Sequence, residues 1–264
     1  MKGLDPGLLT GTLLGGEITL SEGKVHSFKE EIQARKTRMG EINARVDSEL
    51  NRFFTLSGEQ RSLFLKSLGL SEADLDPSFL SSQAGLPRTI SLILEWLKTR
   101  SLHFGESAYR ALEAMLAEKG IAFTREDLAT QLILIDILAG ILTPLDNKEF
   151  NSSAEDELVI SLYAMKKAAK LYGLDTFALK MSYEDLLAHY RDSCPSSLET
   201  CSFRAVLHVG GNHYVTVTQV TADAITYIDP GAGSDGVKEI ITVGKTEFME
   251  VWGGTVLTSR APPP

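Results

Sequence analysis

The sequence predicts an α+β protein, in which a helical N-terminal module precedes helices packed on an antiparallel sheet. Two observations carry this prediction. Between residues 25 and 54, apolar residues recur at intervals of three, four or seven, which is the spacing of an amphipathic helix. Over residues 213–220 and 224–229, apolar and polar residues instead alternate, which is typical of paired strands.

The composition is that of an ordinary globular protein and excludes several classes of function. The 264 residues are 43% hydrophobic and 23% charged, with a formal net charge of -9. Clustered Lys and Arg are not seen, so no nucleic-acid partner is expected. The longest apolar run, Leu132 to Leu142, contains Asp136 and is too short to cross a bilayer, which takes roughly 20 residues. We therefore expect a buried helix there and no membrane span.

Four segments are expected along the chain. Residues 1–22 are interrupted by glycine and are expected to form a flexible arm, followed by a helical module over residues 23–120. A sheet-containing domain then spans residues 121–260, and residues 261–264 form a disordered tail. The arm has no basic region beyond Lys2, so it makes no convincing signal peptide, and a cytoplasmic location is favoured.

The helical module is expected to contain four helices. The first, roughly Val25 to Phe54, has an apolar stripe suited to packing on its own core or on a second copy of the chain. Three shorter helices follow, and their ends are marked by Ser57, Gly69, Pro87 and Gly120. The last of them is expected over Glu106 to Lys119.

A further helix is expected from Asp127 to Ala139, ending at Gly140. Thr124 fits its N-cap, and Asp127 complements the positive end of its dipole. Capping explains this aspartate without any catalytic role. A carboxylate close to His213 would also suit binding of a peptide amine.

The most informative residues are His213 and Asp229, which stand at the far ends of the two alternating segments. Only residues 221–223 separate the segments, which is short enough for a hairpin. Antiparallel pairing then brings the imidazole to within a rung or two of the carboxylate. Such a pair can activate a nucleophile, because the carboxylate orients the imidazole as a general base. A surface histidine beside an Asp-Pro turn is the structural alternative.

The C-terminal half resembles a known family. The matching pieces are, in chain order, Leu162–Leu174, Ala178–Leu186, Ala205–His208, Asn212–Val215, Asp229–Pro230, Glu247–Phe248 and Val251–Gly254. From about Thr124 to Ser259 the chain is similar to the bacteriocin-processing cysteine peptidases, papain-like domains that cut double-glycine leader peptides, and to their free-standing relatives. The resemblance implies a papain-like domain, with a helical lobe packed on an antiparallel sheet. His213 and Asp229 would be its remnant dyad, and Asp127, Gly211, Asn212 and Trp252 would contact the bound peptide.

The chain departs from this family at the nucleophile. The family places a Cys-Gly pair at the N-terminus of a buried helix, where the dipole and the partner histidine favour the thiolate. We assign that helix to Asp127–Ala139, and counting back from Gly140 by the family's helix length reaches Glu126, Asp127 or Leu128. None of these is a thiol. The glutamine that the family uses as an oxyanion donor is absent from the preceding residues 121–123 as well. The resemblance therefore predicts a degenerate peptidase.

The two cysteines, Cys194 and Cys201, leave a second hypothesis open. Either thiol could attack a carbonyl, with His213 as general base and Asp229 orienting it, if the sulfur lies within roughly 4 Å of the imidazole. Both precede the strand that starts at Ala205, and no helix N-terminus is apparent there to activate them. Two loop thiols, or one disulfide, are the structural alternatives.

The function expected from the sequence is recognition of an extended peptide or protein segment by a catalytically degenerate domain; the alternative is an active papain-like cysteine hydrolase. No cofactor is implied. His26, His103, His189 and His208 show no metal-ligand spacing, so no metal site is expected.

Overall fold

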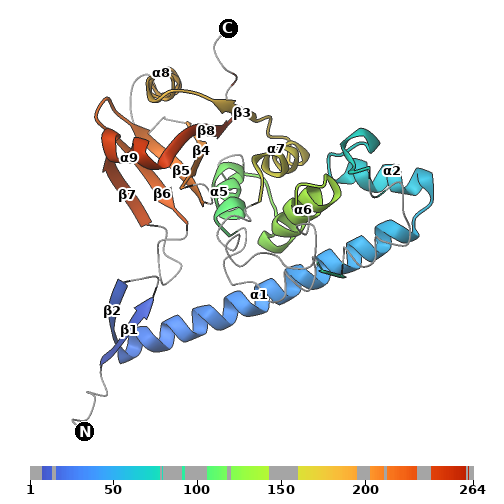
Figure 1. Ribbon diagram of the computed structural model, residues 1–264, viewed down its shortest axis with the longest axis horizontal. Helices are drawn as coiled ribbons and strands as arrows, with labels where there is room; N and C mark the ends of the chain where they lie inside the picture. The colour runs from blue at the N-terminus through green and yellow to red at the C-terminus, as the bar shows by residue number, and fades with distance from the viewer. Residues whose placement is uncertain are drawn as a thin grey trace.

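The computed structural model describes residues 8–13, 16–77, 79, 91–92, 106–117, 120–142, 160–194, 203–210, 213–230, 239–259 and 261. The fold is α+β, as predicted, with helices on both faces of a six-stranded antiparallel sheet (Figure 1). The described helices are α1 (Glu22–Thr55), α2 (Gly58–Ser67), η1 (Glu72–Asp74), α5 (Glu106–Ala117), α6 (Arg125–Leu138), α7 (Leu162–Leu171), α8 (Tyr183–Ser193) and α9 (Lys245–Val251).

The long first helix is confirmed, and so is the way the second helix begins and ends. One stripe of α1 is buried, and it consists of Met39, Ile42, Val46, Leu50 and Phe53. Ser57 and Gln60 form a capping box at the start of α2. Gly69, shortly after its end, has φ +68°, a conformation that glycine adopts without a steric penalty. The helix predicted over residues 87–102 lies almost entirely outside the described residues.

A hairpin occupies the place where we expected a flexible arm. Strands β1 (Leu8–Leu13) and β2 (Gly16–Ser21) pair antiparallel, with Leu8 opposite Ser21. Pairing of this kind joins backbone groups and needs no particular side chain, so the glycines of this segment do not prevent it. The hairpin lies beside the first turns of α1 (Figure 1).

The main sheet has the strand order β3-β8-β4-β5-β6-β7. Its strands are β3 (Phe177–Lys180), β4 (Ala205–Val209), β5 (His213–Val220), β6 (Ala224–Asp229), β7 (Glu239–Gly244) and β8 (Trp252–Thr258). The predicted hairpin is confirmed as β5 and β6, which pair antiparallel with Thr216 opposite Ile228.

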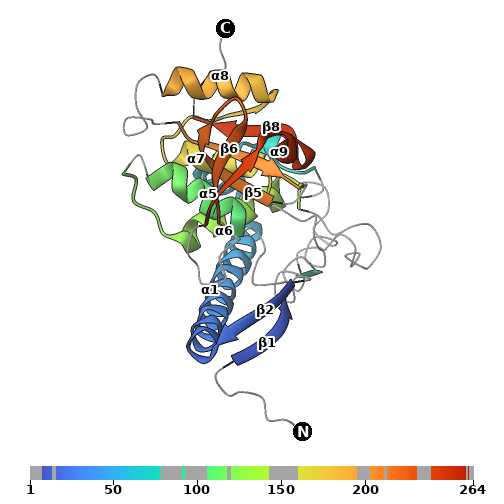
Figure 2. The ribbon, with the colours of Figure 1, turned by 90° about the vertical axis from the view of Figure 1, so that its left-hand side faces the viewer.

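The sheet separates two hydrophobic cores. On one face, Val206, Tyr214 and Leu257 join the core formed with α1, α2, α5, α6 and α7. On the other face, Val215 and Val217 pack with residues of α8 and α9. Figures 1 and 2 show α5 and α8 on opposite sides of the sheet. The core of the N-terminal helices is therefore continuous with one face of the sheet.

A buried carboxylate joins α6, α7 and the sheet. Asp136 is 2% exposed and accepts hydrogen bonds from the backbone N–H and the hydroxyl of Ser161, the N-cap of α7. The preceding residue, Ile160, accepts a hydrogen bond from the Tyr214 hydroxyl at 2.7 Å. Burial raises the pKa of Asp136 to about 6, and the hydrogen bonds from Ser161 oppose that rise. The start of α7 is thereby fixed against the strand that carries His213.

We predict that Asp136 makes the folded protein less stable as the pH rises. Its pKa is about 6 when folded against an ordinary value of 3.8, so the folded chain binds more protons between these pH values. The free energy of unfolding therefore falls as the pH rises through about 6, by roughly 1–3 kcal/mol from this group. Urea unfolding at pH 4.5 and pH 7 should show this fall in the native chain and a smaller one in Asp136→Asn.

Asp185→Asn is the matched control for this measurement. Hydrogen bonds from Ser182 lower the pKa of Asp185, which caps α8 at the surface, so its contribution to stability has the opposite sign and is lost as the pH falls. An equal fall in the native chain and in Asp136→Asn would contradict the prediction.

Candidate functional site

The structure brings His213 and Asp229 together. His213 is the first residue of β5, Asp229 is the last residue of β6, and both therefore stand at the same end of the sheet. The imidazole Nε2 lies 2.7 Å from Oδ1 of the carboxylate. The predicted pairing is confirmed, while the role of the pair in the function stays a prediction.

The geometry of the pair leaves one ring nitrogen for a third group. Because Nε2 faces the carboxylate, Nδ1 is the nitrogen that can take a proton from a nucleophile or bind a ligand. The side chains of His213 and Asp229 are 31% and 16% exposed, so the imidazole can be reached from solvent while the carboxylate is largely covered. This is the arrangement expected of an oriented general base.

The helix that packs against the histidine strand is α5. It lies along β5 and β4 and contributes Ala108, Ala111 and Leu112 to the core on that face (Figure 1). A buried arginine fixes its position, because the Arg110 Nη1 donates a hydrogen bond of 2.9 Å to the carbonyl oxygen of Pro230. Pro230 directly follows Asp229, so the guanidinium ties α5 to the end of the strand that bears the carboxylate.

This placement corrects the assignment of α6 as the helix that faces His213. The elements that α6 packs against most are α1, α7 and α5. The predicted helix itself is confirmed, with Thr124 as its N-cap, but its first turn points to α1, where Asp127 pairs with Arg45. The strongly apolar sequence of α6 reflects burial among helices on most sides, which gives the same sequence signal as packing on a sheet.

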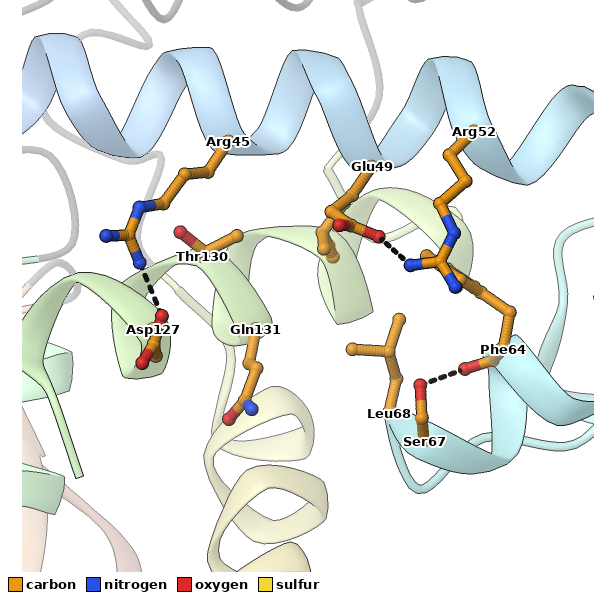
Figure 3. Close-up of a pocket in the computed structure, with 10 residues that line it drawn as sticks. Arg45, Glu49, Arg52, Phe64, Ser67, Leu68, Asp127, Thr130 and Gln131 are labelled. Atoms are coloured by element: carbon orange, nitrogen blue, oxygen red, sulfur yellow. Dashed lines mark hydrogen bonds and ion pairs between the residues drawn. The ribbon is translucent and has the colours of Figure 1, made fainter. Parts of the chain in front are cut away.

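Asp127 lines a pocket on the side of α6 that faces α1. This pocket has a volume of about 430 Å³ and lies between α1, α2 and α6 (Figure 3). Its lining combines the charged side chains of Arg45, Glu49, Arg52 and Asp127 with polar and apolar ones. Figure 3 shows Arg45 of α1 bonded to Asp127 of α6, and Arg52 bonded to Glu49 along α1. Asp127 thus lies in the first turn of α6, where its backbone N–H donates to the Thr124 cap and its carboxylate pairs with Arg45 of α1.

The first turn of α5 carries a residue that the sequence reasoning missed. The count that led from Gly140 to residues 126–128 leads from Gly120 to residues 106–108, and Gly120 has φ +63° after the end of α5. The middle position is Ser107, which is half-buried. The signal was present in the sequence, because the helix from Glu106 to Lys119 with its C-cap glycine was predicted, but it was assigned to the N-terminal module.

The other predicted site residues are placed less favourably. Trp252 is 2% exposed and packs on Phe248, and its Nε1 donates to the carbonyl of Thr255. It is a core residue and no peptide contact, because it faces the core beneath α9. Cys194 is disulfide-bonded and partly buried at the end of α8. Three predicted residues, Cys201, Gly211 and Asn212, lie outside the described residues.

Two further observations limit the chemistry of the described residues. Among them, no group of three or more His, Cys, Asp or Glu side chains is arranged to hold a metal ion. Nor does any helix in the described ranges have the length and apolar character needed to cross a membrane.

Comparison with known proteins gives the family of the C-terminal part. Residues 146–263 match the model of the Peptidase C39 family, so this part of the chain carries a Peptidase C39 family domain and the predicted resemblance is confirmed. No curated protein sequence matches the chain.

Two solved structures are distantly similar. One is a double glycine motif protease from an AMS/PCAT transporter, in complex with the leader peptide; it is 17% identical, with a TM-score of 0.39, over 60% of this chain and 86% of that chain. The other is the N-terminal peptidase C39 like domain of the toxin secretion ATP-binding protein from Vibrio parahaemolyticus, which is 12% identical, with a TM-score of 0.34, over 59% of this chain and 96% of that chain.

We predict that Arg110 stabilises the site through its bond to Pro230. Arg110→Met removes a buried hydrogen bond from a charged group, so the free energy of unfolding should fall by about 1.5–3 kcal/mol. Urea unfolding measures this change. Arg191→Met, at an exposed position on α8, is the control and should stay within about 0.5 kcal/mol of the native chain. If the two substitutions lower the free energy of unfolding equally, the Arg110 bond does not stabilise the site.

Proposed function

We propose that the C-terminal domain binds an extended peptide or protein segment and is degenerate as a cysteine peptidase. The observation that carries this proposal is an intact, solvent-accessible His213–Asp229 pair beside a helix whose first turn holds no cysteine. The matched family is one of peptidases, and recognition of a peptide needs fewer groups than its cleavage does.

The end of the sheet offers suitable groups for a peptide backbone. The Nδ1 of His213, which is not the nitrogen that faces the carboxylate, can donate or accept a hydrogen bond according to its protonation. The first turn of α5 presents backbone N–H groups that have no partner within the helix, and these attract carbonyl oxygens. A peptide bound across the two could accept hydrogen bonds from these N–H groups and form another with Nδ1 of His213.

The cysteine alternative receives no support from Cys194. A sulfur in a disulfide has no thiolate to attack with, and this one lies at the end of α8, packed on the core between the sheet and that helix. The only other cysteine of the sequence is Cys201. Attack by a thiol would therefore first require reduction.

We predict that peptide binding depends on the paired side chains. The full chain should bind a fluorescein-labelled leader peptide that ends in a double glycine, as measured by fluorescence anisotropy. His213→Ala removes the open ring nitrogen and should weaken binding roughly 10-fold, the effect of losing one hydrogen bond to a group that can be charged.

Asp223→Ala is the matched control for this experiment. Asp223 is exposed in the turn between β5 and β6, at the other end of the same hairpin, so its loss should leave the affinity unchanged. The proposal fails if the native chain does not bind the peptide, or if His213→Ala and Asp223→Ala bind it equally well.

We also predict that no thiol of the chain behaves as an active-site nucleophile. After mild reduction, iodoacetamide should alkylate Cys194 and Cys201 no faster than an ordinary exposed thiol, and His213→Ala should leave both rates unchanged. Mass spectrometry of the alkylated peptides gives the rates. A rate that falls in His213→Ala would restore the cysteine hydrolase alternative.

A further inference from the structure

We propose that Ser107 is the nucleophile of this site, so that Ser107, His213 and Asp229 form a serine hydrolase arrangement acting on carboxyl esters or amides of the bound segment. The inference rests on the proposed function, because the segment is bound beside the pair, and it goes further by giving the site an activity that needs no thiol.

The bond from Arg110 fixes the level at which α5 meets the end of the strand. Side chains on a helix lean toward its N-terminus, so the group that Arg110 contacts lies level with the turn before it. That group is the carbonyl of Pro230. Ser107 is three residues before Arg110 and therefore lies on the same face of the helix, in this earlier turn.

The His213–Asp229 pair adjoins the residue that accepts the bond from Arg110. Pro230 follows Asp229, whose carboxylate holds Nε2 of His213 at 2.7 Å. The bond from Arg110 to Pro230 brings the first turn of α5, which holds Ser107, to the end of the sheet that bears the imidazole and the carboxylate. Because Nε2 is engaged, Nδ1 is the nitrogen available to the hydroxyl.

Solvent reaches the imidazole, and the N-terminus of α5 favours negative charge. Ser107 is half-buried and His213 is 31% exposed, so a carbonyl group can reach both from solvent. The α5 helix is 12 residues long, and the N–H groups of its first turn are placed to stabilise negative charge on a carbonyl oxygen that is being attacked.

The chemistry balances with water as the second substrate. The Ser107 oxygen bonds to the carbonyl carbon while its proton passes to Nδ1 of His213. The bond from carbon to the leaving amine or alcohol then breaks, and Nδ1 returns the proton to the leaving group. Water, deprotonated by the same nitrogen, cleaves the acyl-serine ester and restores the hydroxyl. A hydroxyl needs this base far more than a thiol does, so loss of the imidazole should abolish the reaction.

A fluorophosphonate probe tests the proposal on the full chain. Its phosphorus is attacked by an activated serine hydroxyl with loss of fluoride, and peptide mass spectrometry should locate the adduct on Ser107. Ser107→Ala should remove the adduct, and His213→Ala should slow labelling roughly 100-fold or more, the low end of what a general base contributes. Absence of labelling in the folded native chain would overturn the assignment of activity.

A cysteine at the same position tests the placement separately. In Ser107→Cys, iodoacetamide should alkylate the new thiol faster than an ordinary exposed thiol at neutral pH, and adding His213→Ala should remove that advantage. The matched control is Glu126→Cys, in the first turn of α6, which shares the helix N-terminus but lies away from the imidazole. The assignment to α5 is wrong if His213→Ala leaves the alkylation rate at position 107 unchanged, or if it changes the rate only at position 126.

Probe labelling tests the nucleophile, and fluorescence anisotropy tests peptide binding. Labelling needs no peptide, and anisotropy needs no reaction. A chain that binds the peptide but takes no probe contradicts the nucleophile and leaves peptide binding intact. A chain that takes the probe at Ser107 but binds no peptide contradicts peptide recognition.

Discussion

The packing of α5 along β5 is the contact on which the site depends. It covers the face of the sheet that carries Tyr214, and a hydrogen bond from Arg110 ties the helix to Pro230, the residue after Asp229. Packing of apolar side chains alone would allow the helix to slide along the sheet, since it is not directional. The hydrogen bond from Arg110 to Pro230 removes that freedom, because a buried guanidinium needs its acceptor at one particular level.

The N-terminal helices support this contact from behind. The α6 helix packs on α5 and holds α7 through Asp136, and α7 in turn receives the Tyr214 hydroxyl at Ile160. On the far side of α7, Tyr163 and Lys167 both donate to Asp74 of η1, and although burial opposes it, these hydrogen bonds with those from Ser71 lower the pKa of that carboxyl. The chain of contacts thus runs from the N-terminal module to the residue next to His213.

Much of this could be predicted from the sequence, because it is encoded locally. The stripe of α1, the helix caps at Ser57 and Thr124, and the β5–β6 hairpin with its His213–Asp229 pair all depend on residues close together along the chain. The helix that covers the sheet could not be predicted in this way. Both α5 and α6 end before a glycine of positive φ, so a count back from the glycine fits either helix. The choice depends on long-range packing and on the hydrogen bond from Arg110 to Pro230. Trp252 could not be placed for a related reason, since an aromatic residue followed by two glycines suits a binding surface and a core equally well.

The position of α5 also has a consequence for how the protein can be divided. The stretch that matches the peptidase family begins at residue 146, after both α5 and α6. Excised at that point, the fragment would lose the part of this core that α1, α2, α5 and α6 supply to Val206, Tyr214 and Leu257, and full burial of a large apolar side chain is worth roughly 1.5–3 kcal/mol. The stretch that matches the family is therefore smaller than the hydrophobic core in which it takes part.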